Sequence, residues 1–260
     1  MHIEVINATA TAPSTGAAAA AVSGDSLTVK NGLVAAGVTI AALWSTHQTA
    51  GFDQILFPSA HDTTRGFRAS APATVNPFQL PLGVQMEVQP QELISLNIAG
   101  SATGGDVEQI GMLLRYGNLP GVSQRLLTAD DVQKQVKKLT TIEQSITSSA
   151  GPGYSGSVAI NNASDLLRAN TDYAVLGIAA RTAVHCISIK GPDTGNVRIG
   201  IPGTLRGELQ SGFFMMLSRA TGQPFVPVIN SGNKNSTFIE VATDENAGTF
   251  ISTLFLAELN

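Results

Sequence analysis

Two short runs, in which apolar residues alternate with other residues, are joined by a compact turn and limit the fold that this chain can adopt. In residues 184–190 the apolar side chains of Ile187 and Ile189 would share one face of a strand, and in residues 197–201 every second residue is valine or isoleucine. Residues 191–196 lie between them, and their proline, glycines and asparagine suit a chain reversal. This pattern predicts a β-hairpin, and no residue in it is an evident catalyst.

Further strand-like runs follow one another along most of the chain, separated by Gly, Pro and Asn. They are residues 2–6, 26–30, 51–58, 78–88, 92–99, 225–230, 237–242 and 249–258. Residues 33–44 and 107–116 suit either a strand or a short helix. Two helices are predicted, at 129–139 after the N-cap Thr128 and at 205–220 before Gly222. The excess of strands over helices predicts a mainly β fold.

Domain boundaries are suggested by composition. Residues 1–24 change from a short strand pattern to an aperiodic Ala, Thr, Ser and Gly tract, which predicts an N-terminal arm that is ordered only when a partner holds it. Residues 25–260 would form one or two β domains, and the Gly/Ser-rich segment 145–156 is the candidate internal boundary. No internal repeat of the length that builds solenoids or propellers is evident.

The composition favours a protein that packs against neighbours. Only 13% of the residues are charged, whereas 43% are hydrophobic and 26 are glycine, so much of the surface must be neutral and small. A net charge of −4 with dispersed basic residues argues against direct nucleic-acid binding. The N-terminus lacks the pattern of a signal peptide, and the longest apolar run, residues 33–44, is too short to span a bilayer.

Motifs with chemical meaning are few. The single cysteine, Cys186, lies in a strand pattern and is expected to be a small buried residue. The four histidines, at positions 2, 47, 61 and 185, show no zinc-ligand spacing, and no phosphate-binding glycine motif is present, so no metal or cofactor is predicted. Residues 24–27 spell the GDSL block of a hydrolase family, but the aspartate that the family places before its histidine is missing, because Thr182 precedes His185.

Four consecutive large apolar residues stand out in the second predicted helix. Phe213, Phe214, Met215 and Met216 cannot all face one helix stripe, so some of them must contact a second surface. That surface is either another part of the same domain or a neighbouring subunit, since Met and Phe are enriched at subunit interfaces. These four residues are our candidate subunit interface.

In style, the chain resembles bacteriophage and viral coat proteins of the β-barrel kind. The likeness covers mainly residues 78–260 and rests on the strands at 78–88, 92–99 and 249–258, on the segment 116–121, and on the 191–196 hairpin turn. It implies a jelly-roll type barrel or sandwich, single or double, with a few short helices and no cofactor. The absence of a basic arm departs from coat proteins that package nucleic acid by charge.

The expected function is therefore a structural capsid protein, not an enzyme, that self-assembles into a homo-oligomeric viral or phage shell. It would be assembled in the host cytoplasm and located in the virion, with other virion proteins as further partners. Two alternatives stay open: a carbohydrate-binding β-sandwich, for which the 5% aromatic content is low, and a GDSL-like esterase, for which no base is found.

Overall fold

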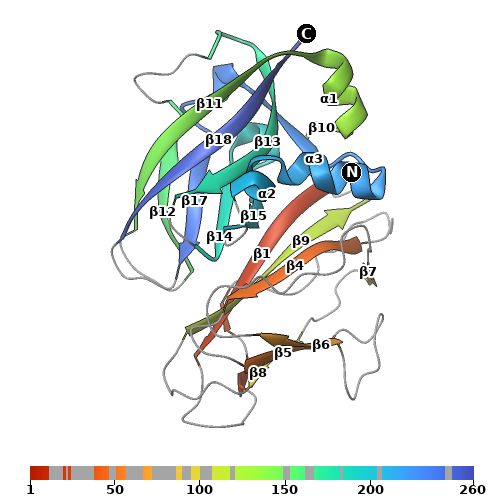
Figure 1. Ribbon diagram of the computed structural model, residues 1–260, viewed down its shortest axis with the longest axis vertical. Coiled ribbons are helices and arrows are strands. Elements are labelled where there is room, and N and C mark those ends of the chain that lie inside the picture. Colours follow the sequence, from red (N-terminus) through yellow and green to blue (C-terminus); the bar gives the residue numbers. More distant parts are fainter. Residues whose placement is uncertain are drawn as a thin grey trace. The chain divides into compact units, whose positions relative to one another are not determined.

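The computed structural model divides into two compact units (Figure 1). It describes residues 1–11, 20–21, 23–24, 38–46, 51–56, 67–71, 86–89, 95–99, 107–117, 121–148, 153–161, 167–181, 184–203, 207–243 and 248–260. Unit 1 comprises Met1–Val5 and Gly121–Asn260, and unit 2 comprises Ile6–Pro120. The described residues are mainly β, as predicted, and each unit is considered by itself.

Unit 1 has two antiparallel sheets whose strand orders are β10-β16-β13-β18-β11 and β12-β17-β14-β15. The strands are β10 Leu126–Leu127, β11 Val136–Thr147, β12 Gly153–Ala159, β13 Asp172–Ala180, β14 Cys186–Lys190, β15 Ile199–Pro202, β16 Val226–Asn230, β17 Phe238–Thr243 and β18 Thr249–Leu259. If the eight strands β11 to β18 are lettered B to I in chain order, the sheets are B-I-D-G, extended by β10, and C-H-E-F. This is the strand order of a jelly roll.

The described residues of unit 2 also form two sheets, in the orders β3-β1-β9-β4-β7 and β2-β8-β5-β6. The strands are β1 His2–Thr11, β2 Ala20–Ala21, β3 Ser23–Gly24, β4 Val38–Thr46, β5 Gly51–Leu56, β6 Phe67–Ala71, β7 Met86–Val88, β8 Ser95–Ala99 and β9 Val107–Tyr116. With β3 set aside as an added edge strand, lettering the other eight from B to I again gives B-I-D-G and C-H-E-F. The chain therefore contains the jelly-roll strand order twice.

The core of unit 1 lies between its two sheets and beneath its helices. Strand β14 is enclosed on both faces, because Cys186, Ile187, Ser188 and Ile189 are all 0% exposed. The largest buried side chains of the unit are aromatic: Tyr173, Phe214, Phe225 and Phe250. Burying a side chain of this size stabilises the folded state by roughly 1.5–3 kcal/mol, so these rings are major contributors to the unit's stability.

The predicted hairpin is confirmed. Strands β14 and β15 pair antiparallel with Ile187 opposite Ile201 and Ile189 opposite Ile199. The turn contains the short 3₁₀ helix η1 Pro192–Thr194, and Asn196 has a φ of 58°, in the left-handed region that asparagine tolerates. The Thr194 hydroxyl accepts a hydrogen bond from Gly191 N at 3.0 Å and donates to Val197 O at 2.7 Å, which closes the turn.

Both predicted helices differ in extent from the structure. The first, α1 Ala129–Gln135, ends four residues early, because Val136 takes an extended ψ of 127° and begins β11. Residues 136–139 are therefore in a strand, where pairing with β18 outweighs their helical propensity. The second is two helices, α2 Gly207–Ser211 and α3 Phe213–Thr221, and Gly222 ends α3 at a φ of 67°, as predicted.

The two ambiguous apolar segments are strands, β4 and β9. They pair antiparallel along most of their length, with Trp44 opposite Gly111. The predicted strand at residues 26–30 lies outside the described residues, and of 78–88 only Met86–Val88 is described, as β7. A second 3₁₀ helix, η2 Ser231–Asn233, follows β16.

The division of the chain also differs from the predicted boundary. The two units meet in sequence at Pro120 and Gly121, whereas residues 145–156 run from the end of β11 to the start of β12 and belong to unit 1. The Gly/Ser-rich composition there belongs to a connection between two sheets of one unit, which has the same sequence signature as a linker.

The first eleven residues of the predicted N-terminal arm include the strand β1, which spans His2–Thr11. Gln124 fixes its start in unit 1, since its side-chain oxygen accepts from Ile3 N and its amide donates to Ile3 O, both at 2.8 Å. Val5 N donates to Arg198 O at 2.8 Å. The idea that residues 1–24 contact neighbouring copies stays a prediction.

Candidate functional site

The predicted interface residues begin helix α3, and the structure divides them into two pairs. Phe213 and Phe214 are 5% and 0% exposed, and their rings meet edge to face with centroids 5.7 Å apart. Met215 and Met216 are half-buried. The second surface met by the phenylalanines therefore lies within unit 1, and only the two methionines retain surface for a subunit contact. The interface itself stays a prediction.

Helix α3 is tied to α1 by a serine. Ser218 Oγ accepts a hydrogen bond from Ala129 N at 2.9 Å and donates to Gln223 O at 2.6 Å. A pocket of about 200 Å³ opens beside this contact; its lining is Thr128, Ala129, Asp130, Ser218, Arg219 and Gly222. The contact fixes the first turn of one helix against the last turn of the other.

The start of α1 is a capping box, as Thr128 suggested. Asp131 N donates to Thr128 Oγ1 at 3.1 Å, and Thr128 N donates to Asp131 Oδ2 at 3.3 Å. Hydrogen bonds from the side chain and then the backbone of Thr128 lower the pKa of the Asp131 carboxyl. These bonds between Thr128 and Asp131 fix the first turn of α1.

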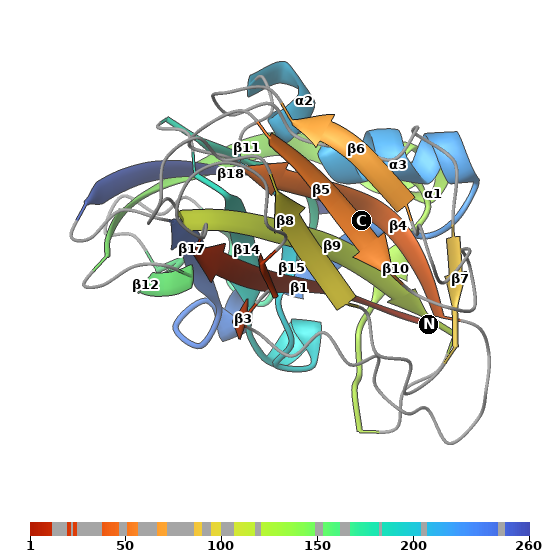
Figure 2. The same cartoon turned by 90° about the horizontal axis from the view of Figure 1, so that it is seen from below.

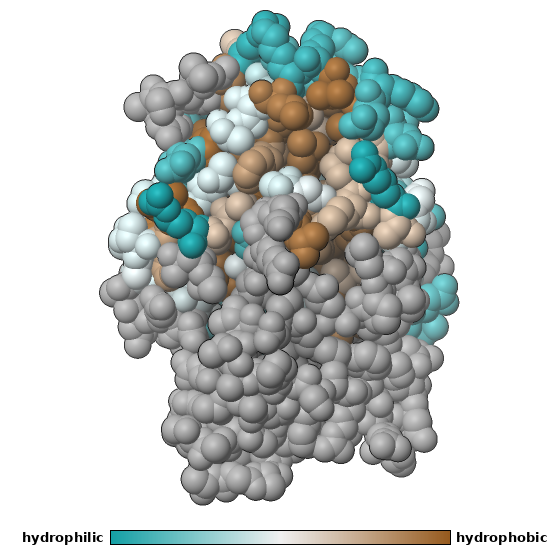
Figure 3. Space-filling view, in the orientation of Figure 1, coloured by the Kyte–Doolittle hydropathy of each residue, from teal (hydrophilic) through white to brown (hydrophobic). Residues whose placement is uncertain are grey.

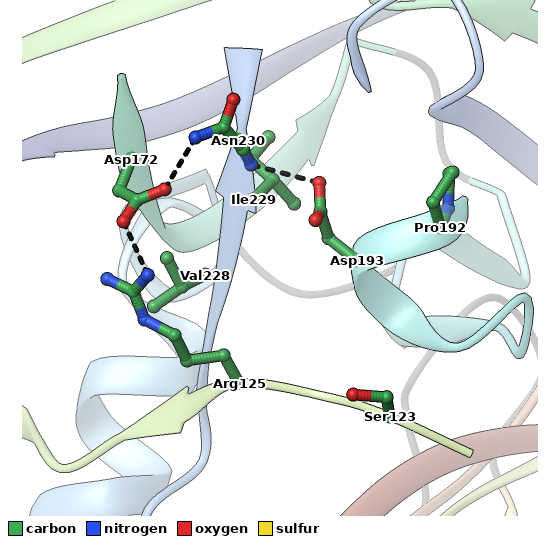
Figure 4. A pocket seen from close by; sticks show the side chains of 8 residues that line it. All are labelled: Ser123, Arg125, Asp172, Pro192, Asp193, Val228, Ile229 and Asn230. Carbon is green, nitrogen blue, oxygen red and sulfur yellow. Dashed lines mark hydrogen bonds and ion pairs between the residues drawn. The ribbon is translucent and has the colours of Figure 1, made fainter. Parts of the chain in front are cut away.

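A second pocket, of about 140 Å³, is lined mainly by polar groups from β13, β16, η1 and the segment just before β10 (Figure 4). Arg125 forms an ion pair with Asp172, whose other oxygen accepts from Asn230 Nδ2 at 2.8 Å. Asp193 accepts from Asn230 N at 2.9 Å and also from Asn233 Nδ2. Both carboxylates therefore hold neighbouring strands and turns together.

Electrostatics agree with a structural role for Asp172. Burial raises the pKa of its carboxyl, but the hydrogen bonds from Asn230 and Arg125 and the positive charge of Arg125 lower it more, so the net shift is downward. The group is therefore held ionised near neutral pH, and a general acid would need the opposite shift.

The structure describes two of the four histidines, and both are buried: His2 is 5% and His185 3% exposed. His47, His61 and residues 25–27 of the GDSL block lie outside the described residues. Cys186 is buried, as expected, and its sulfur accepts a hydrogen bond from Tyr154 Oη at 3.3 Å. Within the described ranges, no group of three His, Cys, Asp or Glu residues is arranged to hold a metal ion. In the same ranges no helix has the length and apolar character needed to cross a membrane.

The buried environment of His2 predicts a pH dependence of stability. Burial, and then the positive charge of the α-amino group, lower the pKa of the His2 imidazole from 6.5. A hydrogen bond with the backbone of Val122 raises this pKa, but by less. Between the lowered pKa and 6.5 the unfolded chain binds a proton that the folded chain does not, so stability is complete above pH 6.5 and is lost as the pH falls. The free energy of unfolding, measured with urea from about pH 7 to about pH 5, should fall less steeply for His2→Gln than for the unaltered protein. An unchanged slope in the variant would contradict this role.

The most exposed large apolar side chain that the structure describes was not singled out by sequence reasoning. Leu139 is 72% exposed and lies on β11, next to Lys137 and Lys138. Figure 3 shows hydrophobic residues at the surface in the upper part of the view, where β11, β18 and α1 run in Figure 1. The signal available in the sequence was the run of β-branched residues after Leu139, which favours a strand over a helix.

Comparison with known proteins gives no family. No protein-family model and no curated protein sequence matches the chain. Among solved structures, the PBSX exported protein XepA is 9% identical with a TM-score of 0.29, over 97% of this chain and 86% of that one.

Viral capsid proteins are also among the structures found. The major capsid protein P2 from bacteriophage PM2 is 9% identical with a TM-score of 0.21, over 99% of this chain and 97% of that one. A structure described as the triple jelly roll fold and turret assembly in an archaeal virus is 13% identical with a TM-score of 0.26, over 96% of this chain and 59% of that one. Likenesses of this size do not establish a relationship.

Proposed function

We propose that this protein is a structural capsid subunit that self-assembles into a viral shell. The observation that carries the proposal is the strand order, B-I-D-G and C-H-E-F, found in each of the two units. Jelly rolls of this kind occur in viral capsid proteins, lectin domains and cupins. The fold therefore limits the possible functions to a few classes, and the properties of the surface distinguish among these classes.

The neutral surface supports assembly over a dispersed monomer. Charged residues make up 13% of the chain, about half the usual share, so little like-charge repulsion keeps copies apart. Repeated contacts in a closed assembly can each be weak, since affinity is distributed over many of them. Such contacts need complementary packing and no dedicated binding pocket.

The aromatic side chains argue against the carbohydrate-binding alternative. Sugar-binding surfaces use exposed Trp and Tyr rings, but the one tryptophan, Trp44, is 0% exposed, and Tyr116 and Tyr173 are 2% and 1% exposed. The remaining tyrosine, Tyr154, is covered by the Arg198 guanidinium, 3.9 Å from the ring centre. These four rings therefore offer no open stacking platform.

We also propose a structural role in place of a catalytic one. In the described residues, the two histidines are buried and the carboxylates of the polar pocket are committed to hydrogen bonds. Under this proposal the protein is located in the virion and its principal partner is itself.

The exposed part of the predicted interface can be tested separately from the fold. The double substitution Met215→Ser/Met216→Ser should weaken self-association about tenfold, because it removes apolar surface from the contact. It should cost unit 1 only about 1–2 kcal/mol of stability, since both side chains are half-buried. Ala220→Ser, an exposed position on the same helix, is the control. Equal association of both variants and the unaltered protein would remove α3 from the interface.

The proposal is tested by sedimentation velocity of the full chain at micromolar concentration and physiological salt. Self-assembly predicts species far larger than the 26.9 kDa monomer, growing with protein concentration. A single monomeric boundary over the whole range would contradict the proposal and favour a monomeric binding module.

A further inference from the structure

The long strand β11 ends one sheet of unit 1. It spans Val136–Thr147, and in the described residues its only hydrogen-bonded neighbour is β18. Figure 1 shows β11 beside β18 on the side away from β13, and Figure 2 shows the same two strands next to each other. A strand in this position presents backbone N–H and C=O groups that can pair with another strand.

One end of this edge is occupied. Gly156 of β12 lies so close to Ile146 and Thr147 that an added Cβ would be 2.8 Å from Thr147 O. The stretch from Val136 to Gln144 is therefore the part that a further strand could join.

Many side chains along this stretch are exposed to solvent. Lys137, Lys138 and Leu139 are consecutive exposed residues, and Leu139 is 72% exposed. Because side chains alternate along the regular part of the strand, Leu139, Thr141 and Glu143 share the outer face and are exposed, and Lys137, the extra residue of a bulge between Val136 and Lys138, is exposed beside them. An exposed leucine on a long edge strand is a feature that monomeric proteins usually avoid.

The charges on this face are complementary to those of a second copy. In an antiparallel pair of two β11 strands related by a twofold axis at Thr140, Lys137 of each copy lies opposite Glu143 of the other. Leu139 then lies opposite Thr141, which would cover part of its exposed surface. Opposite charges facing each other across strands stabilise pairing, and like charges oppose it.

Other registers lose this match. In every allowed register, outer-face residues of one copy lie opposite outer-face residues of the other. The register of the pair can therefore change only in steps of two residues. Centring the pair on Leu139 places Lys137 opposite Thr141, and centring it on Lys138 places the two copies of Lys138 opposite each other. The arrangement centred on Thr140 alone pairs lysine with glutamate.

We propose that β11 is a self-association edge, joined by β11 of a second copy in antiparallel register about Thr140, so that the β10-β16-β13-β18-β11 sheets of two subunits become continuous. The inference rests on the proposed self-assembly and names one of its contacts. The interface is isologous, so each Lys137 to Glu143 pair occurs twice.

A charge exchange tests the register. Lys137→Glu and Glu143→Lys should each weaken dimer formation about tenfold, since two attractive pairs per interface become repulsive. The double variant Lys137→Glu/Glu143→Lys restores opposite charges in the opposing positions and should regain the affinity of the unaltered protein. Lys134→Glu, an exposed change on α1 outside the strand, is the matched control. Sedimentation equilibrium gives the dissociation constants, and circular dichroism confirms folding.

Disulfide trapping tests the twofold axis. Opposing residues of paired strands have Cα atoms about 4.5–5.5 Å apart, within the range for a disulfide. Thr140→Cys should therefore form a covalent dimer with oxidised glutathione, whereas Ser145→Cys, whose two copies would be roughly 30 Å apart, should not. The native Cys186 is buried and supplies no background.

The outcomes separate this contact from the proposed function. Assembly that is insensitive to all charge variants, or equal trapping at positions 140 and 145, would overturn the β11 contact and leave the shell proposal intact. If the unaltered protein is monomeric and Thr140→Cys is not trapped, both are overturned. Restoration by the double variant together with trapping only at position 140 supports the contact.

Discussion

Replacing Phe214 by alanine is expected to lower the free energy of unfolding of unit 1 by about 4 kcal/mol. The Phe214 side chain is 0% exposed and packs edge to face on Phe213, so its removal leaves a cavity in the core. The measurement is urea unfolding followed by circular dichroism. Fluorescence of Trp44, the single tryptophan, gives the unfolding of unit 2 separately.

Met215→Ala is the matched control for this substitution, because Met215 is the next residue of α3 and is half-buried. It should cost about 1 kcal/mol. Equal losses for the two variants would contradict the division of the apolar run into a core pair and a surface pair.

Gly177→Ala is expected to cost unit 1 about 3 kcal/mol or more. Gly177 lies in β13 beneath α2, and an added Cβ would overlap the carbonyl oxygen of Gln210 and lie 2.6 Å from the carbonyl carbon of Ser211. These are backbone atoms, so no side chain can rotate to make room. Gln210 also anchors α2, since its side chain accepts from Ala180 N at 3.1 Å and donates to Gly203 O at 2.8 Å.

The matched control for this glycine is Gly212→Ala. An added Cβ at Gly212 has no atom within 4 Å, and its φ of −122° suits any residue. Its cost should stay within about 1 kcal/mol, the difference between glycine and alanine at a helix N-cap. Thermal unfolding that ranks the two variants equally would contradict the packing of α2 on β13.

Local patterns in the sequence predicted the local structure well. The hairpin of β14 and β15 was evident because its alternation and its turn residues lie within eighteen consecutive positions, 184–201. The end of α3 at Gly222 followed from the same kind of short-range signal. Helix α1 was predicted too long because the lysines after Gln135 suit a helix, and only pairing with β18 makes them a strand.

The sequence suggests a jelly roll but does not encode the strand order of two of them in any local pattern. That order depends on pairs far apart in the chain, such as Thr147 with Thr249. Strands of two residues, such as β2 and β10, are too short to show any alternation. The two units therefore repeat one topology without a visible repeat in the sequence.

The candidate interface illustrates the same limit. The four residues from Phe213 to Met216 need two surfaces by their spacing alone, but the packing of α3 decides which of them face the core. The exposure of Leu139 likewise follows from the position of β11 at the end of its sheet, which is a property of the whole unit.

Electron microscopy of the purified full-length protein under assembly conditions would show whether the chain builds a shell. A shell-forming subunit should give closed particles of uniform size, made of one kind of subunit. A field of separate monomers, with no closed particles at any protein concentration tested, would contradict it.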